Sequence, residues 1–203
     1  PNVHEEMSLE PLTDYSIFKA DCEKILLEYQ SKDFTTITIR PATVCGYSPR
    51  QRLDVVVNIL TNLAFHKREI TIFGGSQLRP NIHIKDMAEA YISLINAPKE
   101  KVAGEIFNAG SQNLKIKEIA EIVAKIVPLY TKHKVELNYS KNDDNRSYRI
   151  TSDKINDVLN FKIKKNIEDA VHDLCKAFEK NLIKDSFNEQ FINIKTLQKL
   201  NLS

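Results

Sequence analysis

Glycine is scarce in this chain, with only five among 203 residues, and tryptophan is absent. None of the glycines belongs to a fingerprint of the kind that cradles nucleotide phosphates. The pair at residues 74–75 follows a strand-like run, but no helix opening with Lys-Ser or Lys-Thr comes after it, so the pair predicts a turn. A nucleotide site built on a glycine-rich loop is therefore not expected within these residues.

The chain also lacks long apolar runs and any marked excess of one charge. No stretch of 18 apolar residues occurs, and the sequence does not open on a charged and then apolar signal segment. Its net charge is only +2, so the charge balance implies no nucleic acid and no membrane as a partner. The expected location is cytoplasmic.

Cysteine is rare and scattered. Cys22, Cys45 and Cys175 lie far apart, without a Cys-x-x-Cys pair and without a histidine pair at ligand spacing. We therefore expect no metal site, and we expect the three cysteines to be small, buried apolar side chains.

What is present is an ordinary globular composition, 42% hydrophobic and 28% charged. A chain of this length buries about 70% of its unfolded surface and folds as one or two domains. It opens on Pro1 rather than Met and runs directly into a polar loop. Together with the missing glycine-rich fingerprint, this opening leads us to expect a piece of a longer protein.

Helical and extended patterns alternate along the chain, which predicts α/β layers. Alternating or β-branched runs predict strands at residues 36–40, 69–73, 105–109 and 135–139. Apolar spacing predicts helices at residues 15–29, from residue 53, after residue 86, at residues 116–127 and after the capping residue Asn166. The helix after residue 86 is expected to bury Ala88, Tyr91, Ile92 and Ile95, and the polar stretch 141–149 is expected to be a solvated loop. The tail from Ser186 suggests a last helix, packed either on the body or on a partner.

Tyr15 and Lys19 lie four residues apart at the start of the first predicted helix. This spacing places the phenol and the ammonium on one face, a turn apart. A nearby cation favours the phenolate form, so Tyr15 is a candidate acceptor for a substrate proton. Two common residues at a common spacing are also typical of an ordinary solvated helix start.

Five stretches of the chain, taken in order, carry a resemblance. They are Tyr15-x-x-x-Lys19, Arg40-Pro41-Ala42-Thr43-Val44-Cys45-Gly46, Arg79-Pro80-Asn81-Ile82-His83-Ile84-Lys85-Asp86, Ile106-Phe107-Asn108-Ala109-Gly110, and Arg146-Ser147-Tyr148 before Asp153-Lys154-Ile155. Their series resembles the extended short-chain dehydrogenase/reductase family, in particular its NAD-dependent nucleotide-sugar epimerases and dehydratases. The likeness covers residues 1 to about 180.

The resemblance implies an α/β fold: the C-terminal part of a Rossmann-like, doubly wound parallel sheet plus a small α/β substrate-binding domain. Residues 1–50 would end the NAD-binding Rossmann domain, whose N-terminal half, with the family's catalytic Ser or Thr, lies outside these residues. Residues 51–180 would be mostly the sugar-nucleotide-binding part with returning core segments. Residues 181–203 would form a C-terminal helical tail.

For the cofactor, the resemblance implies NAD and assigns four residues. Tyr15 is the base, and Lys19 binds the nicotinamide ribose and tunes Tyr15. The backbone near Pro41 and Ala42 touches the nicotinamide.

For the substrate, the resemblance implies a nucleotide-diphosphate sugar. Arg79 and Arg146 match the two arginines that clasp its diphosphate, for which the planar guanidinium is well suited. Arg52 is a further candidate for that clasp. Thr43 stands where the family often has a substrate-contacting Asn.

The predicted function is NAD-dependent epimerisation of a nucleotide-diphosphate sugar, similar to that of UDP-glucose 4-epimerase, with the fragment inactive alone. A dehydratase or a reductase is the alternative among enzymes. The alternative from another class is a non-catalytic, truncated sugar-nucleotide-binding module. A homodimer stays open as the assembly.

Overall fold

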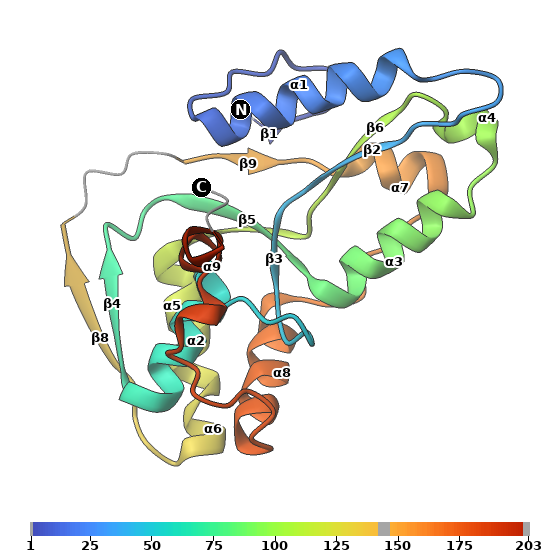
Figure 1. Ribbon diagram of the computed structural model, residues 1–203. Helices are drawn as coiled ribbons and strands as arrows, with labels where there is room; N and C mark the ends of the chain where they lie inside the picture. The colour runs from blue at the N-terminus through green and yellow to red at the C-terminus, as the bar shows by residue number, and fades with distance from the viewer. Residues whose placement is uncertain (1, 142–146, 201–203) are drawn as a thin grey trace.

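A computed structural model describes residues 2–141 and 147–200 (Figure 1). Its strands are β1 (Asn2–Val3), β2 (Thr38–Pro41), β3 (Thr43–Cys45), β4 (Glu69–Phe73), β5 (Leu78–His83), β6 (Ile106–Ala109), β7 (Gln112–Lys115), β8 (Glu136–Ser140) and β9 (Arg149–Ile150). Its helices are α1 (Asp14–Glu28), α2 (Val56–Lys67), α3 (Ile84–Ile95), α4 (Lys99–Val102), α5 (Ile116–Ile126), α6 (Pro128–Thr131), α7 (Asp153–Leu159), α8 (Ile167–Glu179), the 3₁₀ turn η1 (Glu189–Phe191) and α9 (Asn193–Lys199). The fold is α/β, as predicted.

Most strand pairs are parallel. The pairs β1–β9, β2–β6, β3–β5 and β4–β8 run parallel, whereas β7 pairs with β5 in the antiparallel sense. The sequence pattern does not predict β7, because residues 112–115 alternate too briefly between Gly110 and the following helix to give a strand signal. The four predicted strands are all present.

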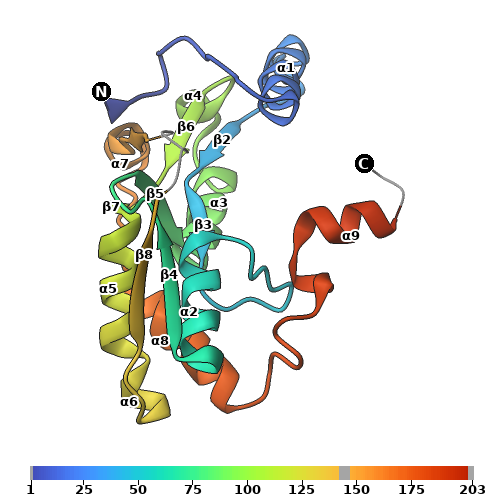
Figure 2. The same ribbon diagram turned by 90° about the vertical axis from the view of Figure 1, so that its left-hand side faces the viewer.

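The pair β2–β6 lies between α1 on one side and α3 with α7 on the other (Figures 1 and 2). Alternation along β2 explains this arrangement: Arg40 points to α1, while Ile39 packs against the cluster formed by α3, α7 and Phe107. The prediction of a helix from Tyr15 that lies beside a strand parallel to its sheet neighbour is thus confirmed, since β2 runs parallel to β6.

One edge of β2 has no strand beside it within the described part of the chain. The N–H groups of Thr38 and Ala42 donate to Glu105 and Ala109 on the β6 side. Because main-chain groups alternate in a parallel pair, those of Ile39 point to the opposite, open edge. The tail after Ser186 does not cover this edge, since it packs near Leu53 instead.

The main core lies below this pair, where α2, α5 and α8 pack around β4 and β8. It contains sixteen buried residues, among them Val57, Ile70, Val123 and Val171. The α8 helix begins with the predicted Asn166 cap, whose side chain accepts the Asp169 N–H at 2.8 Å. This core includes Cys45, the last residue of β3, and so supports the loop that follows β3.

The apolar stripe predicted to be buried on α3 is exposed instead. Tyr91, Ile92 and Ile95 are 48, 52 and 76% exposed, and Ala88 is also exposed. The helix carries a second apolar stripe, Met87, Ala90 and Leu94, which packs on the sheet. Helical spacing alone cannot choose between two such stripes, so the prediction was wrong.

The expectation of three buried cysteines is wrong for Cys22, which is exposed on α1. Cys45 and Cys175 are buried, and burial raises the pKa of each thiol to about 12. Within the described residues, no three His, Cys, Asp or Glu side chains gather as metal ligands. None of the described helices has the length and apolar character needed to span a bilayer.

The tail from Ser186 is anchored at its start and projects at its end (Figure 2). The Leu53 N–H donates to the carbonyl of Phe191, and Asn62 Nδ2 donates to that of Ser186. The α9 helix buries none of its residues. Most of the charged stretch predicted as a loop, residues 142–146, lies outside the described residues.

Candidate functional site

The start of α1 is fixed by a reciprocal cap. Thr13 Oγ1 accepts the Ser16 N–H at 3.3 Å, and Ser16 Oγ accepts the Thr13 N–H at 3.0 Å. Such a capping box satisfies two of the orphan donors of a helix start. It places Tyr15 in the first turn of the helix.

The register of α1 on β2 can be followed through two contacts. Glu23 pairs with Arg40, and just past the C-terminal end of the helix Gln30 Oε1 accepts the Thr36 N–H at 2.7 Å. The helix therefore runs antiparallel to the strand. With a rise of about 1.5 Å per helix residue and about 3.3 Å per strand residue, we expect Lys19 to lie about two strand residues, and Tyr15 about four, past the level of Arg40.

Tyr15 and Lys19 thus lie beyond the carboxyl end of β2, which is where open α/β sheets bind their ligands. Together with Glu23 they occupy successive turns of one helix face. Tyr15 is 75% exposed and Lys19 is also exposed. Among the described residues, neither the phenol oxygen nor the ammonium has a hydrogen-bond or ion-pair partner, so both are available to a ligand.

Pro41 and Ala42 form the turn from β2 into β3. Ala42 is buried against Ile82 and Ala109. A Cβ added at Gly110 would lie 3.3 Å from the Ala42 Cβ, so the glycine permits this close approach. Pro41 lines a cavity of about 290 Å³ that also includes Arg52. Two of the predicted site residues therefore share one hollow.

Thr43 opens β3 and lies beside Asn81 of the parallel strand β5. Two residues earlier on β5, the Arg79 guanidinium lies 6.0 Å from the Tyr148 ring centroid and donates to the Leu78 carbonyl at 3.0 Å. Arg146, the other predicted diphosphate ligand, lies outside the described residues.

Arg52 is already engaged. Its Nε and Nη2 donate to the two carboxylate oxygens of Asp54 at 2.9 and 3.0 Å. Asp54 also accepts the Asn193 N–H at 2.8 Å. Arg52 therefore lies between the cavity and the start of α9. To bind a phosphate, it would have to divide its N–H donors between the phosphate and Asp54.

Residues 1–110 of the chain match the family described as NAD dependent epimerase/dehydratase. This match covers more than half of the chain. The chain belongs to the NAD-dependent epimerase/dehydratase family.

Solved structures that resemble the chain include the RMD protein of Pseudomonas aeruginosa complexed with NADPH, at 20% identity and a TM-score of 0.76, covering 88% of this chain and 60% of that one. The dTDP-glucose 4,6-dehydratase of Bacillus anthracis in complex with NAD is 23% identical, with a TM-score of 0.73 and coverage of 89 and 56%. The UDP-glucuronic acid 4-epimerase of Bacillus cereus, in complex with UDP-glucuronic acid and NAD, is 21% identical, with a TM-score of 0.73 and coverage of 89 and 57%. These likenesses show the Rossmann-like fold.

The chain spans 56–60% of the length of these three structures. The family is NAD-dependent, and the three structures hold NAD or NADPH.

Sequence spacing does not single out two residues that the packing of α1 on β2 brings together near Lys19. Glu23 and Arg40 form a half-buried ion pair with a shortest distance of 2.6 Å. One signal was available, because Glu23 continues the four-residue series of Tyr15 and Lys19. Its partner, 17 residues away, could be found only from the packing of α1 on β2.

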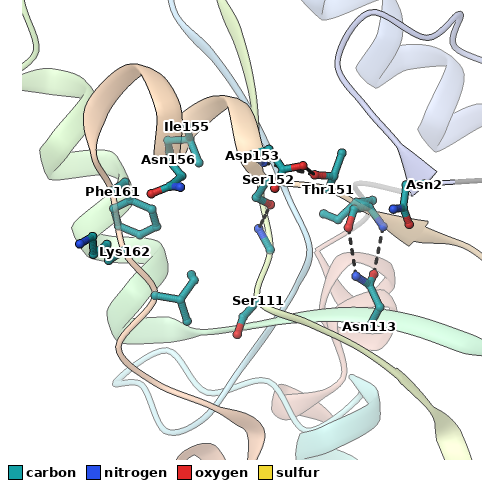
Figure 3. A pocket seen from close by; sticks show the side chains of 13 residues that line it. Asn2, Ser111, Asn113, Thr151, Ser152, Asp153, Ile155, Asn156, Phe161 and Lys162 are labelled. Atoms are coloured by element: carbon teal, nitrogen blue, oxygen red, sulfur yellow. Dashed lines mark hydrogen bonds between the residues drawn. The ribbon is translucent and has the colours of Figure 1, made fainter.

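A larger cavity, of about 680 Å³, opens between β7, β9 and α7 (Figure 3). Several of its polar groups are already paired: the Asn113 side chain exchanges two hydrogen bonds of 3.0 Å with the Ile150 main chain, and Ser152 Oγ accepts the Gly110 N–H at 2.7 Å. None of the predicted site residues within the described parts of the chain lines it. We therefore assign no part of the family's chemistry to this cavity.

Asp54 makes the attachment of α9 sensitive to acid. Burial raises its pKa, but the hydrogen bonds from Arg52 and the Asn193 N–H, with the charge of Arg52, outweigh burial and hold the pKa below its usual value. A lowered folded-state pKa gives stabilisation that is present above the unfolded value, about 3.9, and is lost as the pH falls through the folded value. We expect the Asn193 end of α9 to detach only as the pH falls through that folded value, which lies below about 3.9.

The measurement is the Asn193 amide resonance followed through an acid titration. Asp54→Asn should give the detached spectrum already at neutral pH. Glu189→Gln, which removes the exposed pair with Lys199 at 2.9 Å, is the matched control and should leave the Asn193 resonance in place. An Asn193 resonance unchanged in Asp54→Asn would contradict the expectation.

Proposed function

We propose that this chain is the C-terminal part of an NAD-dependent epimerase that acts on a nucleotide-diphosphate sugar, similar to UDP-glucose 4-epimerase. The observation that carries the proposal is the placement of Tyr15 and Lys19. They share one helix face beyond the carboxyl end of β2, and their polar atoms have no other partner in the described chain. A phenol and an ammonium so placed suit a proton acceptor and its electrostatic support.

The residues present fit one end of the NAD molecule. Lys19 has three donors for a ribose, and the turn at Pro41 and Ala42 brings main-chain groups to the strand end where a nicotinamide would lie. The other end of the cofactor needs a glycine-rich turn, which these residues do not contain. When bound, NAD accepts a hydride from the sugar carbon and later returns it.

In this proposal Tyr15, as the phenolate, accepts the proton of the sugar hydroxyl while the carbon is oxidised. Lys19, one turn away on the same helix face, holds the ribose. After the keto sugar has rotated to present its other face, the Tyr15 hydroxyl gives the proton back to the carbonyl oxygen. The product is the epimer, and neither proton nor hydride is lost.

We propose that Arg79 and Arg146 bind the diphosphate of the substrate, with Arg52 beside them and Thr43 near the sugar. Arg79 and Thr43 are supported by register, since both lie on the adjacent strands β5 and β3. Arg52 is supported by its place on the hollow that includes Pro41. A guanidinium offers two parallel donors to a phosphate, which suits this task.

The open edge of β2 is where we propose that the cofactor-binding half docks. The flanking helices expose apolar side chains, such as Phe18 of α1 at 68% and Ile95 of α3 at 76%. An unpaired parallel strand with exposed apolar side chains on both flanking helices is suited to receive a further strand and its helices. This surface supports the view that the chain acts with that half and not alone.

Product analysis of the native protein with UDP- and dTDP-sugars and added NAD tests the proposal. Interconversion of two epimers without net reduction of NAD supports it. Loss of water to a 4-keto-6-deoxy sugar would instead indicate the dehydratase, and consumption of NADPH the reductase. Binding of the sugar nucleotide without any turnover would indicate a non-catalytic module.

Arg79→Ala should weaken binding of the sugar nucleotide. Charge-assisted hydrogen bonds are worth roughly 1.5–3 kcal/mol each, so the Kd should rise by about 10- to 150-fold. Titration calorimetry with a UDP-sugar measures this effect. Arg149→Ala, which removes an exposed arginine of β9, is the control and should leave the Kd unchanged. Equal Kd values for both variants would remove Arg79 from the proposed site.

A further inference from the structure

Glu23 of α1 and Arg40 of β2 form an ion pair that is also joined by several hydrogen bonds. Arg40 Nε donates to both Glu23 oxygens, at 3.0 and 3.1 Å, and Arg40 Nη2 donates to Glu23 Oε2 at 2.6 Å. Each side chain is only 20% exposed. A guanidinium that meets a carboxylate through two nitrogens fixes its direction as well as its distance.

The same arginine is tied to the rest of the sheet. Its Nη1 donates to the Glu5 carbonyl at 3.2 Å. The Glu5 side chain, which is buried, accepts the Asn108 N–H of β6 at 2.7 Å. Glu23 is therefore bound to a group that is itself held by β2, β6 and the segment before α1.

Little else holds α1 in place in the described chain. Ala20 is its only buried residue. Near its far end, Gln30 accepts from the Thr36 N–H and hydroxyl at 2.7 and 3.0 Å. Of these polar ties, the one to Arg40 is the nearer to Lys19, being a single turn away.

We propose that Glu23 and Arg40 are positioning residues: they clamp α1 on β2 so that Tyr15 and Lys19 stay at the end of the strand. The catalytic part of this inference rests on the function proposed above for Tyr15, whereas the clamp does not. A slide of the helix by one residue moves Tyr15 by about 1.5 Å. Misplacement of about 1 Å can cost a reaction a hundredfold in rate.

Cys22 provides a way to observe the clamp. It is exposed on α1, next to Glu23, and it is the one accessible thiol, since Cys45 and Cys175 are buried. A second thiol placed by Glu121→Cys lies on an exposed position of α5, in the main body. Spin labels on these two positions report the distance between α1 and the body by double electron–electron resonance.

We expect a narrow distance distribution in the parent protein and a broad one in Glu23→Gln. Arg40→Met should broaden it at least as much, because it also loses the hydrogen bond to the Glu5 carbonyl. The double variant should add nothing to Arg40→Met, because the contact with Glu23 is already lost there. Arg40→Lys keeps the positive charge but lacks the planar guanidinium. Its distance distribution should be intermediate in width between those of the parent protein and Arg40→Met. Asp21→Asn removes the exposed pair with Lys24 on the same helix, at 3.2 Å, and is the matched control.

The activity arm uses the complete enzyme. Glu23→Gln should lower kcat by about 10- to 100-fold with little change in the KM for the sugar nucleotide. Distributions as narrow in Glu23→Gln as in Asp21→Asn would overturn the clamp. Broad distributions with an unchanged kcat would overturn the positioning role. If the parent enzyme does not epimerise, the proposed function fails, and the distances alone still decide the clamp.

Discussion

Under the function proposed above, Tyr15→Phe should lower epimerase turnover by about a hundredfold or more, the usual size of a general-base contribution. The substitution removes only the phenol oxygen, which has no partner in the described chain. Since the side chain is 75% exposed, the fold should be unaffected. The measurement is steady-state epimerisation of UDP-sugars, with a separate titration of NAD, whose binding should persist.

Tyr29→Phe is the control for this result. Tyr29 lies at the other end of the same helix, as its C-cap, and is 65% exposed. Its loss of a hydroxyl should leave turnover unchanged. Near-normal turnover in Tyr15→Phe would show that Tyr15 and Lys19 are an ordinary helix start and that the base lies elsewhere.

Phe107→Ala should cause a large loss of stability. Phe107 is fully buried on β6, in the cluster that includes Leu94 of α3 and Ile155 of α7. Truncation of a buried phenylalanine costs about 3–5 kcal/mol, through lost burial and the cavity left behind. Urea denaturation of the variant and the parent protein, followed by circular dichroism, measures the difference.

Phe73→Ala is the matched truncation, because Phe73 is 55% exposed on β4. Its free energy of unfolding should change by less than about 1 kcal/mol. If the two variants lost equal stability, the packing of α3 and α7 on β6 would not be what holds this part of the fold together.

The sequence predicts best where one pattern permits only one structure. Alternation at residues 69–73 gives β4, with Ile70 and Ile72 fully buried. Asn166 and Asp169 form the capping box that their spacing favours. In both cases the forces are local: the pleat of a strand and the orphan N–H groups of a helix start.

The sequence predicts poorly where the choice depends on distant residues. Met87 is buried and Ile95 exposed because of what α3 packs against, although both belong to apolar stripes. Cys22 is exposed because α1 buries little. Hydrophobicity states which residues can be buried, while the packing of other elements decides which of them are.

The candidate site divides in the same way. Tyr15 and Lys19 are visible in the sequence because one helix carries both. The Glu23–Arg40 pair is not visible, because its partners lie 17 residues apart on two elements. The register that brings them together exists only once the helix lies on the sheet.

Pro41 makes the two ends of the open edge of β2 differ in their capacity to form hydrogen bonds. Ile39 can offer both its N–H and its carbonyl to a strand added at this edge, whereas Pro41, the next residue that faces the same way, has no N–H to give. An added strand would therefore form main-chain hydrogen bonds along the first part of β2 and would miss one at the carboxyl end of β2. The two strands would be free to separate there, level with Lys19. The missing hydrogen bond would then lie at the entrance of the proposed site.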